Sequence, residues 1–324
     1  MKNSKNILII MLSLFILFVS VTPVNAMENF SNGEIMNQVA EETIQKTQSV
    51  NENGLIVVTY TNLDQFIECI HENYEDITDY EIALYIRQYT KQIYEGLSEA
   101  EIVEILLLDN ITTSVEYVTV DELGNVMSLN SGILPRWIDS TRTIEITTSY
   151  SYRKTVGNEK YYKIWASATW LDKPTVAIKD VFGLGTSGTF DSGYTAKASV
   201  YQTLQCLNGC TSKTYDNRSV QANDEVDGDL KMHYAAGVPT IEYVPANASC
   251  SYCLRNTKCT YLSTYIEYGM ITDESVNIQA GYGHSIVNCN VSISFDYTGK
   301  PSITPTASPK GVPYIALPVT VYYS

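Results

Sequence analysis

Apolar positions follow a helical period in the first third of the chain and a two-residue period after it. Three times, a polar residue that can cap a helix precedes Glu or Gln by three positions: Asn62 and Gln65, Thr78 and Glu81, Ser98 and Glu101. Each pair stands before a run with apolar residues three and four apart, so three capped helices are expected. Leu55–Tyr60 and Val115–Val120 are rich in β-branched residues and predict two short strands beside them.

From Thr141 onward the pattern is typical of strands. Thr143–Thr147 and Val291–Phe295 alternate, and the aromatic run Lys160–Trp170 follows a Gly157-Asn158 hairpin turn. Further strands are expected over Thr175–Val181, Thr195–Leu204, Leu230–Ala235, Tyr261–Tyr268, Val276–Gly281 and Ile315–Tyr323. Because no long helical run intervenes, we expect an α+β N-terminal region followed by an all-β antiparallel sandwich or barrel. The proline-rich stretch 300–313 is expected to be an extended loop.

Charge divides the chain at the same place. Residues 27–130 contain 20 Asp and Glu against three Lys and Arg, whereas residues 131–324 contain 16 of each. This step predicts an acidic helical region over 27–130 and a Tyr- and Cys-rich β domain over 131–324. The acidic region is either a well-solvated domain or a pro-region that is cut away near Pro135 and Arg136.

Residues 1–26 have the pattern of a secretory signal peptide, with Lys2 and Lys5 before an apolar run and Ala26 at the cleavage site. The apolar run is short for a membrane-spanning helix, so we expect cleavage, no stable membrane anchor afterwards and an extracellular protein. The residue usage suggests a bacterial source. A formal net charge of −15 makes nucleic acid a poor partner, because phosphate binding needs a basic surface.

Six cysteines form two groups in the second half: Cys206 and Cys210, then Cys250, Cys253, Cys259 and Cys289. In an exported domain an even number of cysteines favours disulfide bonds, and Cys69 is left over. The Cys-x2-Cys spacing at Cys250 and Cys253 leaves a structural zinc site as the alternative. No catalytic motif or cofactor motif is found, so we expect no cofactor, no catalytic metal and, on balance, no enzyme.

Four residues are candidates for a binding site. His284 and Tyr282 lie in the glycine-flanked run Gly281–Ser285, which either brings backbone close to a ligand or forms a bulge or tight bend. Trp165 and Trp170 are an odd number of residues apart, so we expect one in the core and the other in a surface or loop contact. Eighteen of the 25 tyrosines lie in the second half and, if several converge, would suit sugar rings or a protein partner.

One segment of about twenty residues resembles a known group of proteins. Trp165, Trp170, Leu171, Pro174 and Val176, followed by Asp180–Gly183, are similar to a segment of uncharacterised secreted β-rich proteins of Gram-positive bacteria. The resemblance implies an exported β-rich domain behind a short helical region, and it implies no activity.

These patterns favour a non-enzymatic protein that binds an extracellular protein or a glycan at the cell surface or outside it. The alternative is an exported toxin-like or hydrolytic effector whose acidic region is a removable pro-region.

Overall fold

The computed structural model describes residues 31–92, 97–120, 126–129, 142–171, 180–206, 211–220, 230–235, 238–243, 257–285, 291–305 and 311–323. From residue 202 to residue 261 it describes the backbone of the strands only. The chain divides into two compact units, Met1–Glu42 and Thr43–Ser324. Helix α2 (Asn32–Thr43) is the described element of the first unit, and the expected signal peptide lies outside the described residues.

The three expected helices begin where their caps predict. They are α3 (Leu63–Asn73), α4 (Asp79–Tyr89) and α5 (Glu99–Val103), which continues as the 3-10 helix η2 (Glu104–Leu107). Thr78 and Ser98 each form a complete capping box with the Glu three residues on. Asn62 makes no side-chain cap; its backbone is left-handed, with φ 62°, so the start of α3 was predicted correctly but its capping contact was not.

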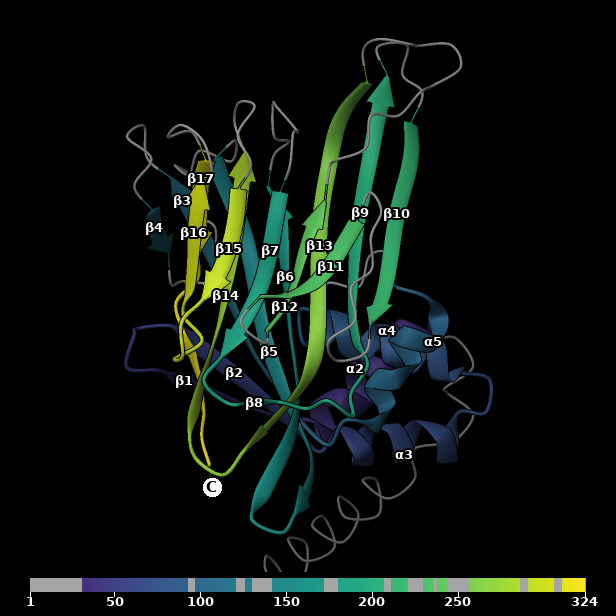
Figure 1. Ribbon diagram of the computed structural model, residues 1–324. Coiled ribbons are helices and arrows are strands. Elements are labelled where there is room, and N and C mark those ends of the chain that lie inside the picture. The colour runs from purple at the N-terminus through teal and green to yellow at the C-terminus, as the bar shows by residue number, and fades with distance from the viewer. Residues whose placement is uncertain are drawn as a thin grey trace, which may run out of the picture. The chain divides into compact units, whose positions relative to one another are not determined.

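Antiparallel strands are the other described elements of the second unit (Figure 1). The larger sheet has ten strands in the order β1-β2-β3-β5-β6-β13-β9-β10, with β4 paired to β3 and β8 to β13. Its strands are β1 (Gln45–Val50), β2 (Ile56–Thr61), β3 (Ile111–Val120), β4 (Val126–Leu129), β5 (Thr143–Val156), β6 (Glu159–Trp170), β8 (Thr189–Phe190), β9 (Ala196–Cys206), β10 (Thr211–Val220) and β13 (Thr257–Thr272). Gly157, with φ 64°, makes the expected turn between β5 and β6.

A second sheet of six strands has the order β11-β12-β7-β14-β17, with β18 paired to β14. Its strands are β7 (Asp180–Thr186), β11 (Leu230–Ala235), β12 (Val238–Tyr243), β14 (Val276–Ser285), β17 (Gly311–Ile315) and β18 (Val319–Val321). The two sheets share one buried core, to which Ile164, Trp170, Tyr268, Leu184 and Ile278 belong. The expected architecture, an α+β region followed by an antiparallel sandwich, is confirmed.

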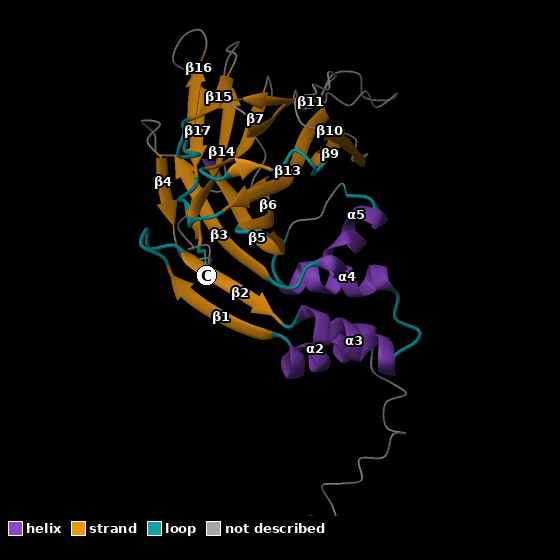
Figure 2. Cartoon of the chain, turned by 60° about the horizontal axis from the view of Figure 1, so that its bottom comes forward, coloured by secondary structure: helices purple, strands orange, loops and turns teal. Residues whose placement is uncertain are grey.

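The opposite face of the larger sheet is polar, and Lys197 on this face binds Glu104 of η2. Figure 2 shows α3, α4 and α5 gathered together on one side of the strands. Along β6 the side chains alternate strictly: Ile164, Ala166 and Ala168 face the core between the sheets, while Lys163 and Trp165 face the other way. Trp165 and Trp170 therefore lie on opposite faces as expected, but both are buried, at 3% and 5% exposure.

A hairpin of β15 (Val291–Phe295) and β16 (Pro301–Pro305) lies where the sequence predicted only a strand and a loop. Prolines are tolerated here because β16 pairs only with β15 and β17 lies at the edge of its sheet. A Cβ added at Gly281 would come within 2.8 Å of Pro301, so glycine allows this hairpin to pack against β14. The register of β14 is continuous through Gly281 and Gly283, so the expected bulge is absent and close packing explains the glycine.

The larger sheet joins strands from both regions that the charge pattern distinguishes. Strand β3 pairs with β5 over eight positions, from Thr112 opposite Tyr150 to Thr119 opposite Thr143. Strands β1 and β2 extend the same sheet beyond β3. The acidic region thus contributes an integral part of the β-sheet.

Candidate functional site

Three of the four predicted binding residues meet in the core between the two sheets. Trp170 comes from β6, Tyr282 and His284 come from β14, and Tyr314 of β17 completes an aromatic cluster. The ring centroids of Trp170 and His284 are 5.1 Å apart. Trp165 lies on the other face of the larger sheet, away from this cluster.

A buried carboxylate organises this cluster. Asp180, at the start of β7, accepts a hydrogen bond of 2.5 Å from the Tyr282 hydroxyl, and the Trp170 indole N–H donates to the same hydroxyl at 3.1 Å. The second oxygen of Asp180 accepts from His284 Nδ1 at 2.7 Å. A carboxylate that orients His in this way is also used in catalytic sites. Here Asp180 and Tyr282 have no exposure and His284 has 7%, so among the described residues the network serves to satisfy buried polar groups.

Asp180 was not among the predicted site residues, although it lies in the segment that carries the family resemblance. Its partner His284 is more than one hundred positions away in the sequence, and the two meet because β7 and β14 pair with Asp180 opposite His284. Only the pairing of these strands could have revealed the contact. A binding role for His284, Tyr282, Trp165 and Trp170 stays a prediction.

The disulfide candidates lie outside the residues whose side chains are described. The backbone of Cys206 is opposite Thr257, and that of Cys259 is opposite Leu204. Cys210, Cys250, Cys253 and Cys289 lie in undescribed segments. Disulfide bonds and a zinc site therefore both remain predictions.

The second candidate site is a cavity at which four tyrosines converge, and we call it the tyrosine pocket. It is a cavity of about 440 Å³ on the core-side face of the larger sheet, lined by Thr59, Asn110, Thr112, Tyr150, Tyr152, Thr155, Lys160, Tyr162 and Tyr322. The rings of Tyr150 and Tyr152 lie edge-on to that of Tyr162, at centroid distances of 6.2 and 5.9 Å. Edge-on packing of this kind holds aromatic rings in fixed positions.

The tyrosine pocket is polar and contains one cationic side chain, Lys160. Burial raises the pKa of Tyr150 and Tyr162 above the usual value, so both hydroxyls are protonated at neutral pH. Lys160 lies over the Tyr323 ring at 4.5 Å, and no carboxylate is among the described residues that line the cavity. Tyr322, which directly follows β18, also lines the cavity and is 62% exposed. Rings, hydroxyls, an amide and one ammonium group thus surround a space of the size that small ligands occupy.

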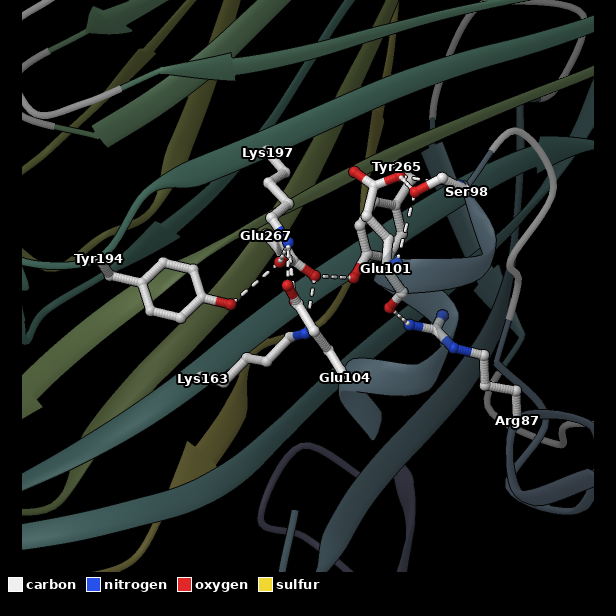
Figure 3. Close-up of polar contacts among 9 residues, drawn as sticks. All are labelled: Arg87, Ser98, Glu101, Glu104, Lys163, Tyr194, Lys197, Tyr265 and Glu267. Carbon is white, nitrogen blue, oxygen red and sulfur yellow. Dashed lines mark hydrogen bonds and ion pairs between the residues drawn. The ribbon is translucent and has the colours of Figure 1, made fainter. Parts of the chain in front are cut away.

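The third candidate site is a network of buried charged side chains (Figure 3). It lies on the face of the larger sheet that points away from the core between the sheets, where Lys197 binds Glu104 of η2. Glu267 of β13 is 2% exposed and binds Lys163 Nζ of β6 at 2.9 Å. The hydroxyl of Tyr194 donates to the Glu267 carboxylate at 2.9 Å, and that of Tyr265 donates to its other oxygen. Burial alone would raise the pKa of Glu267, but Lys163, Lys197 and these hydrogen bonds outweigh it and lower the pKa to about 2.

The helices are tied to this network by Glu104. The capping box of Ser98 and Glu101 fixes the start of α5, and its continuation η2 brings Glu104 within 2.7 Å of Lys197 Nζ. Arg87 of α4 donates to the Glu101 carbonyl at 3.5 Å, and its Nε and Nη1 have no hydrogen-bond partner among the described residues. The pairing of Lys163 with Glu267 had one sequence signal, a Lys between Tyr162 and Ile164 in the interior of an otherwise aromatic and β-branched run.

Comparisons with known proteins add little. No family model matches the chain, and no curated protein matches it. A Bacteroides ovatus protein described as a "Putative lipoprotein" is 9% identical with a TM-score of 0.25, covering 49% of this chain and 46% of its own. A pore forming protein is 5% identical with a TM-score of 0.23, covering 64% of this chain and 91% of its own. A loop-swap mutant of the Necallimastix patriciarum protein Xyn11A is 10% identical with a TM-score of 0.19, covering 57% and 94%.

The chain thus spans less than half the length of the first of these structures. At such low TM-scores these likenesses carry no argument about function. In the described part of the chain, no helix is both long enough and apolar enough to cross a membrane.

Proposed function

We propose that this is a secreted, non-enzymatic binding protein that takes up a neutral oligosaccharide in the tyrosine pocket. The observation that carries the proposal is the convergence of four tyrosines with three threonines and one asparagine around a cavity of about 440 Å³. Tyrosine rings pack against the C–H faces of sugars while hydroxyl and amide groups exchange hydrogen bonds with sugar hydroxyls. A glycan is also a ligand that an exported protein meets.

The architecture supports the proposal because the pocket stands on rigid elements. Seven of its nine lining residues come from β2, β3, β5 and β6, which are consecutive neighbours in the larger sheet, while Asn110 precedes β3 and Tyr322 follows β18. Thr59 and Thr112 face each other across β2 and β3 with their hydroxyls 3.0 Å apart. A site held by paired strands binds with little loss of conformational freedom.

The proposal is tested by titrating the protein with neutral di- and trisaccharides of hexoses and N-acetylhexosamines, with binding followed by calorimetry. Replacing Tyr322 with Ala removes an exposed ring at the edge of the pocket, and we expect about tenfold weaker binding, or about 1.4 kcal/mol. Tyr297→Ala is the matched control, because Tyr297 is 93% exposed in the turn between β15 and β16. Absence of saturable binding across the panel, or an equal effect of the two variants, would refute the proposal.

A further inference from the structure

A β-bulge in β5 places two consecutive cationic residues on one face of the sheet. In the pairing of β5 with β6, Tyr152 is opposite Tyr162 and Lys154 is opposite Tyr161, so Arg153 is an extra residue. Consecutive side chains of a regular strand point to opposite faces, whereas a bulge re-aims them. Arg153 and Lys154 accordingly line the same cavity, and Tyr152 lines the tyrosine pocket on the other side.

The cavity at this bulge, which we call the bulge pocket, has a volume of about 420 Å³. It is bounded by β5, β6 and β9 of the sheet, by the loop before β9 and by η2. Four of the chain's 21 Lys and Arg line it, although the chain as a whole carries a formal charge of −15: Arg153, Lys154, Lys163 and Lys197. Glu104 is the one carboxylate among the described lining residues, so cationic groups outnumber anionic groups in the lining, which favours anions.

Three of the four cations are held in place by carboxylates. Lys163 pairs with Glu267, and Lys197 pairs with Glu104. Arg153 pairs with Asp191 at 3.0 Å and lies over the Tyr194 ring at 4.7 Å. These contacts fix the positions of the three positive groups before any ligand arrives.

Lys154 is different. Among the described residues its contact is with the ring of Tyr161, 4.9 Å away, and no carboxylate pairs with it. Lys154 is thus the one of these four cations that no described carboxylate pairs with; Glu159 lies nearby and accepts a hydrogen bond from the Tyr161 hydroxyl at 3.4 Å. Leu107 of η2, which is 81% exposed, is an apolar residue of the same lining.

We propose that the bulge pocket binds a small organic anion, with its carboxylate, sulfate or phosphate group at Lys154 and Arg153 and its apolar part against Leu107. Arg153 supplies planar N–H donors, and Lys154 supplies an ammonium group with which no described carboxylate pairs. Lys163 and Lys197 are already neutralised by Glu267 and Glu104, so they form part of the pocket wall and are not the groups that bind the anion. The site is separate from the tyrosine pocket, so this inference does not depend on the proposed function.

The experiment uses the full mature chain and three probes: inorganic sulfate, inorganic phosphate and benzoate. Binding is followed by NMR chemical-shift titration at constant ionic strength, with chloride as the balancing ion. Lys154→Gln is the main variant, because Lys154 makes no ion pair with a described residue and its replacement leaves the described buried network intact. Lys300→Gln in the turn between β15 and β16 is the control of equal charge, since Lys300 is exposed and lies outside the bulge pocket.

We expect saturable binding of at least one probe, at least tenfold weaker binding in Lys154→Gln, and unchanged binding in Lys300→Gln. Benzoate binding more tightly than sulfate and phosphate would assign the site to an organic carboxylate with an apolar part. Tighter binding of sulfate or phosphate would assign it to an ester of those acids. Failure of all three probes to saturate, or equal losses in the two variants, would overturn the inference, whatever the outcome of the saccharide titrations.

Discussion

Glu116 allows a test of how the stability of this β-sandwich depends on pH. It lies in the middle of β3 with 1% exposure and faces the C-terminal segment. One carboxyl oxygen accepts the Leu317 N–H at 2.8 Å, and the other is hydrogen-bonded with the Ser128 hydroxyl. Burial raises the pKa of Glu116 from 4.5 to about 7, although the hydrogen bond from Leu317 opposes the shift.

The sign of the effect follows from proton binding. Between pH 4.5 and about 7 the folded protein keeps this proton while the unfolded chain has lost it. Stability therefore falls as pH rises through this interval, by about 1.4 kcal/mol per unit and by roughly 3 kcal/mol in all. Below pH 4.5 both states are protonated, and above about pH 7 both are ionised, so this group adds no slope there.

Glu116→Gln mimics the protonated carboxyl, because the amide oxygen can accept from Leu317 and the NH₂ can donate to Ser128. We expect the variant to match the wild type at pH 4 and to exceed its stability by roughly 3 kcal/mol at pH 8. Urea unfolding followed by tryptophan fluorescence at pH 4, 6 and 8 measures this difference. Glu52→Gln, in the exposed turn between β1 and β2, is the control.

A difference between wild type and Glu116→Gln that stays constant with pH would show that burial does not shift this group. A variant less stable than the wild type at pH 8 would show that the ionised carboxylate is the better acceptor for Leu317 and Ser128. Either result would refute the reasoning.

Two further predictions concern the buried charges and the acidic region. Glu267→Gln leaves Lys163 buried without its partner, so we expect a loss of about 3–5 kcal/mol in urea unfolding at pH 7. Because the pKa of Glu267 is lowered from 4.5 to about 2, this deficit should shrink as pH falls below 4.5, and a deficit independent of pH would contradict the assigned pairing. A chain of residues 131–324 alone lacks β3 and exposes β5 along eight paired positions, so it should self-associate in light scattering. A soluble monomer that unfolds cooperatively would instead show that the acidic region is dispensable.

Local chemistry made much of the fold predictable. The capping boxes at Thr78 and Ser98 are contacts between residues three positions apart, so the pattern alone identifies them. The turn at Gly157 is equally local, and β11 was predicted with its observed bounds. Such signals need no knowledge of what packs against the segment.

What the pattern did not reveal depends on distant partners. Helix α2 and strand β10 were not predicted, and β16 was expected to be a loop because it begins and ends with proline. Proline argues against a central strand, but β16 lies in a two-stranded hairpin where its missing N–H costs nothing. The contacts of Asp180 with His284 and of Lys163 with Glu267 each join residues about one hundred positions apart.

The bulge at Arg153 also could not be predicted from the sequence, and it decides which residues line each candidate pocket. Along β6, Lys160 and Tyr162 reach the tyrosine pocket with the regular two-residue period. Along β5, the residues that reach it are Tyr150, Tyr152 and Thr155, so the period breaks by one position after Tyr152. A pattern read with a fixed period would have placed Lys154 beside Tyr152, on the wrong face.

Both pockets are built from residues on either side of the charge step in the sequence. The acidic region supplies one wall of each: Thr59, Asn110 and Thr112 in the tyrosine pocket, and Glu104, Leu107 and Leu108 in the bulge pocket. A pro-region that masks an independently folded domain would cover the binding sites of that domain from outside. Its removal would leave the walls of those sites complete. Here removal would open both cavities and leave Lys197 without Glu104, its nearest carboxylate. This arrangement favours an acidic region that stays in place as part of the folded protein.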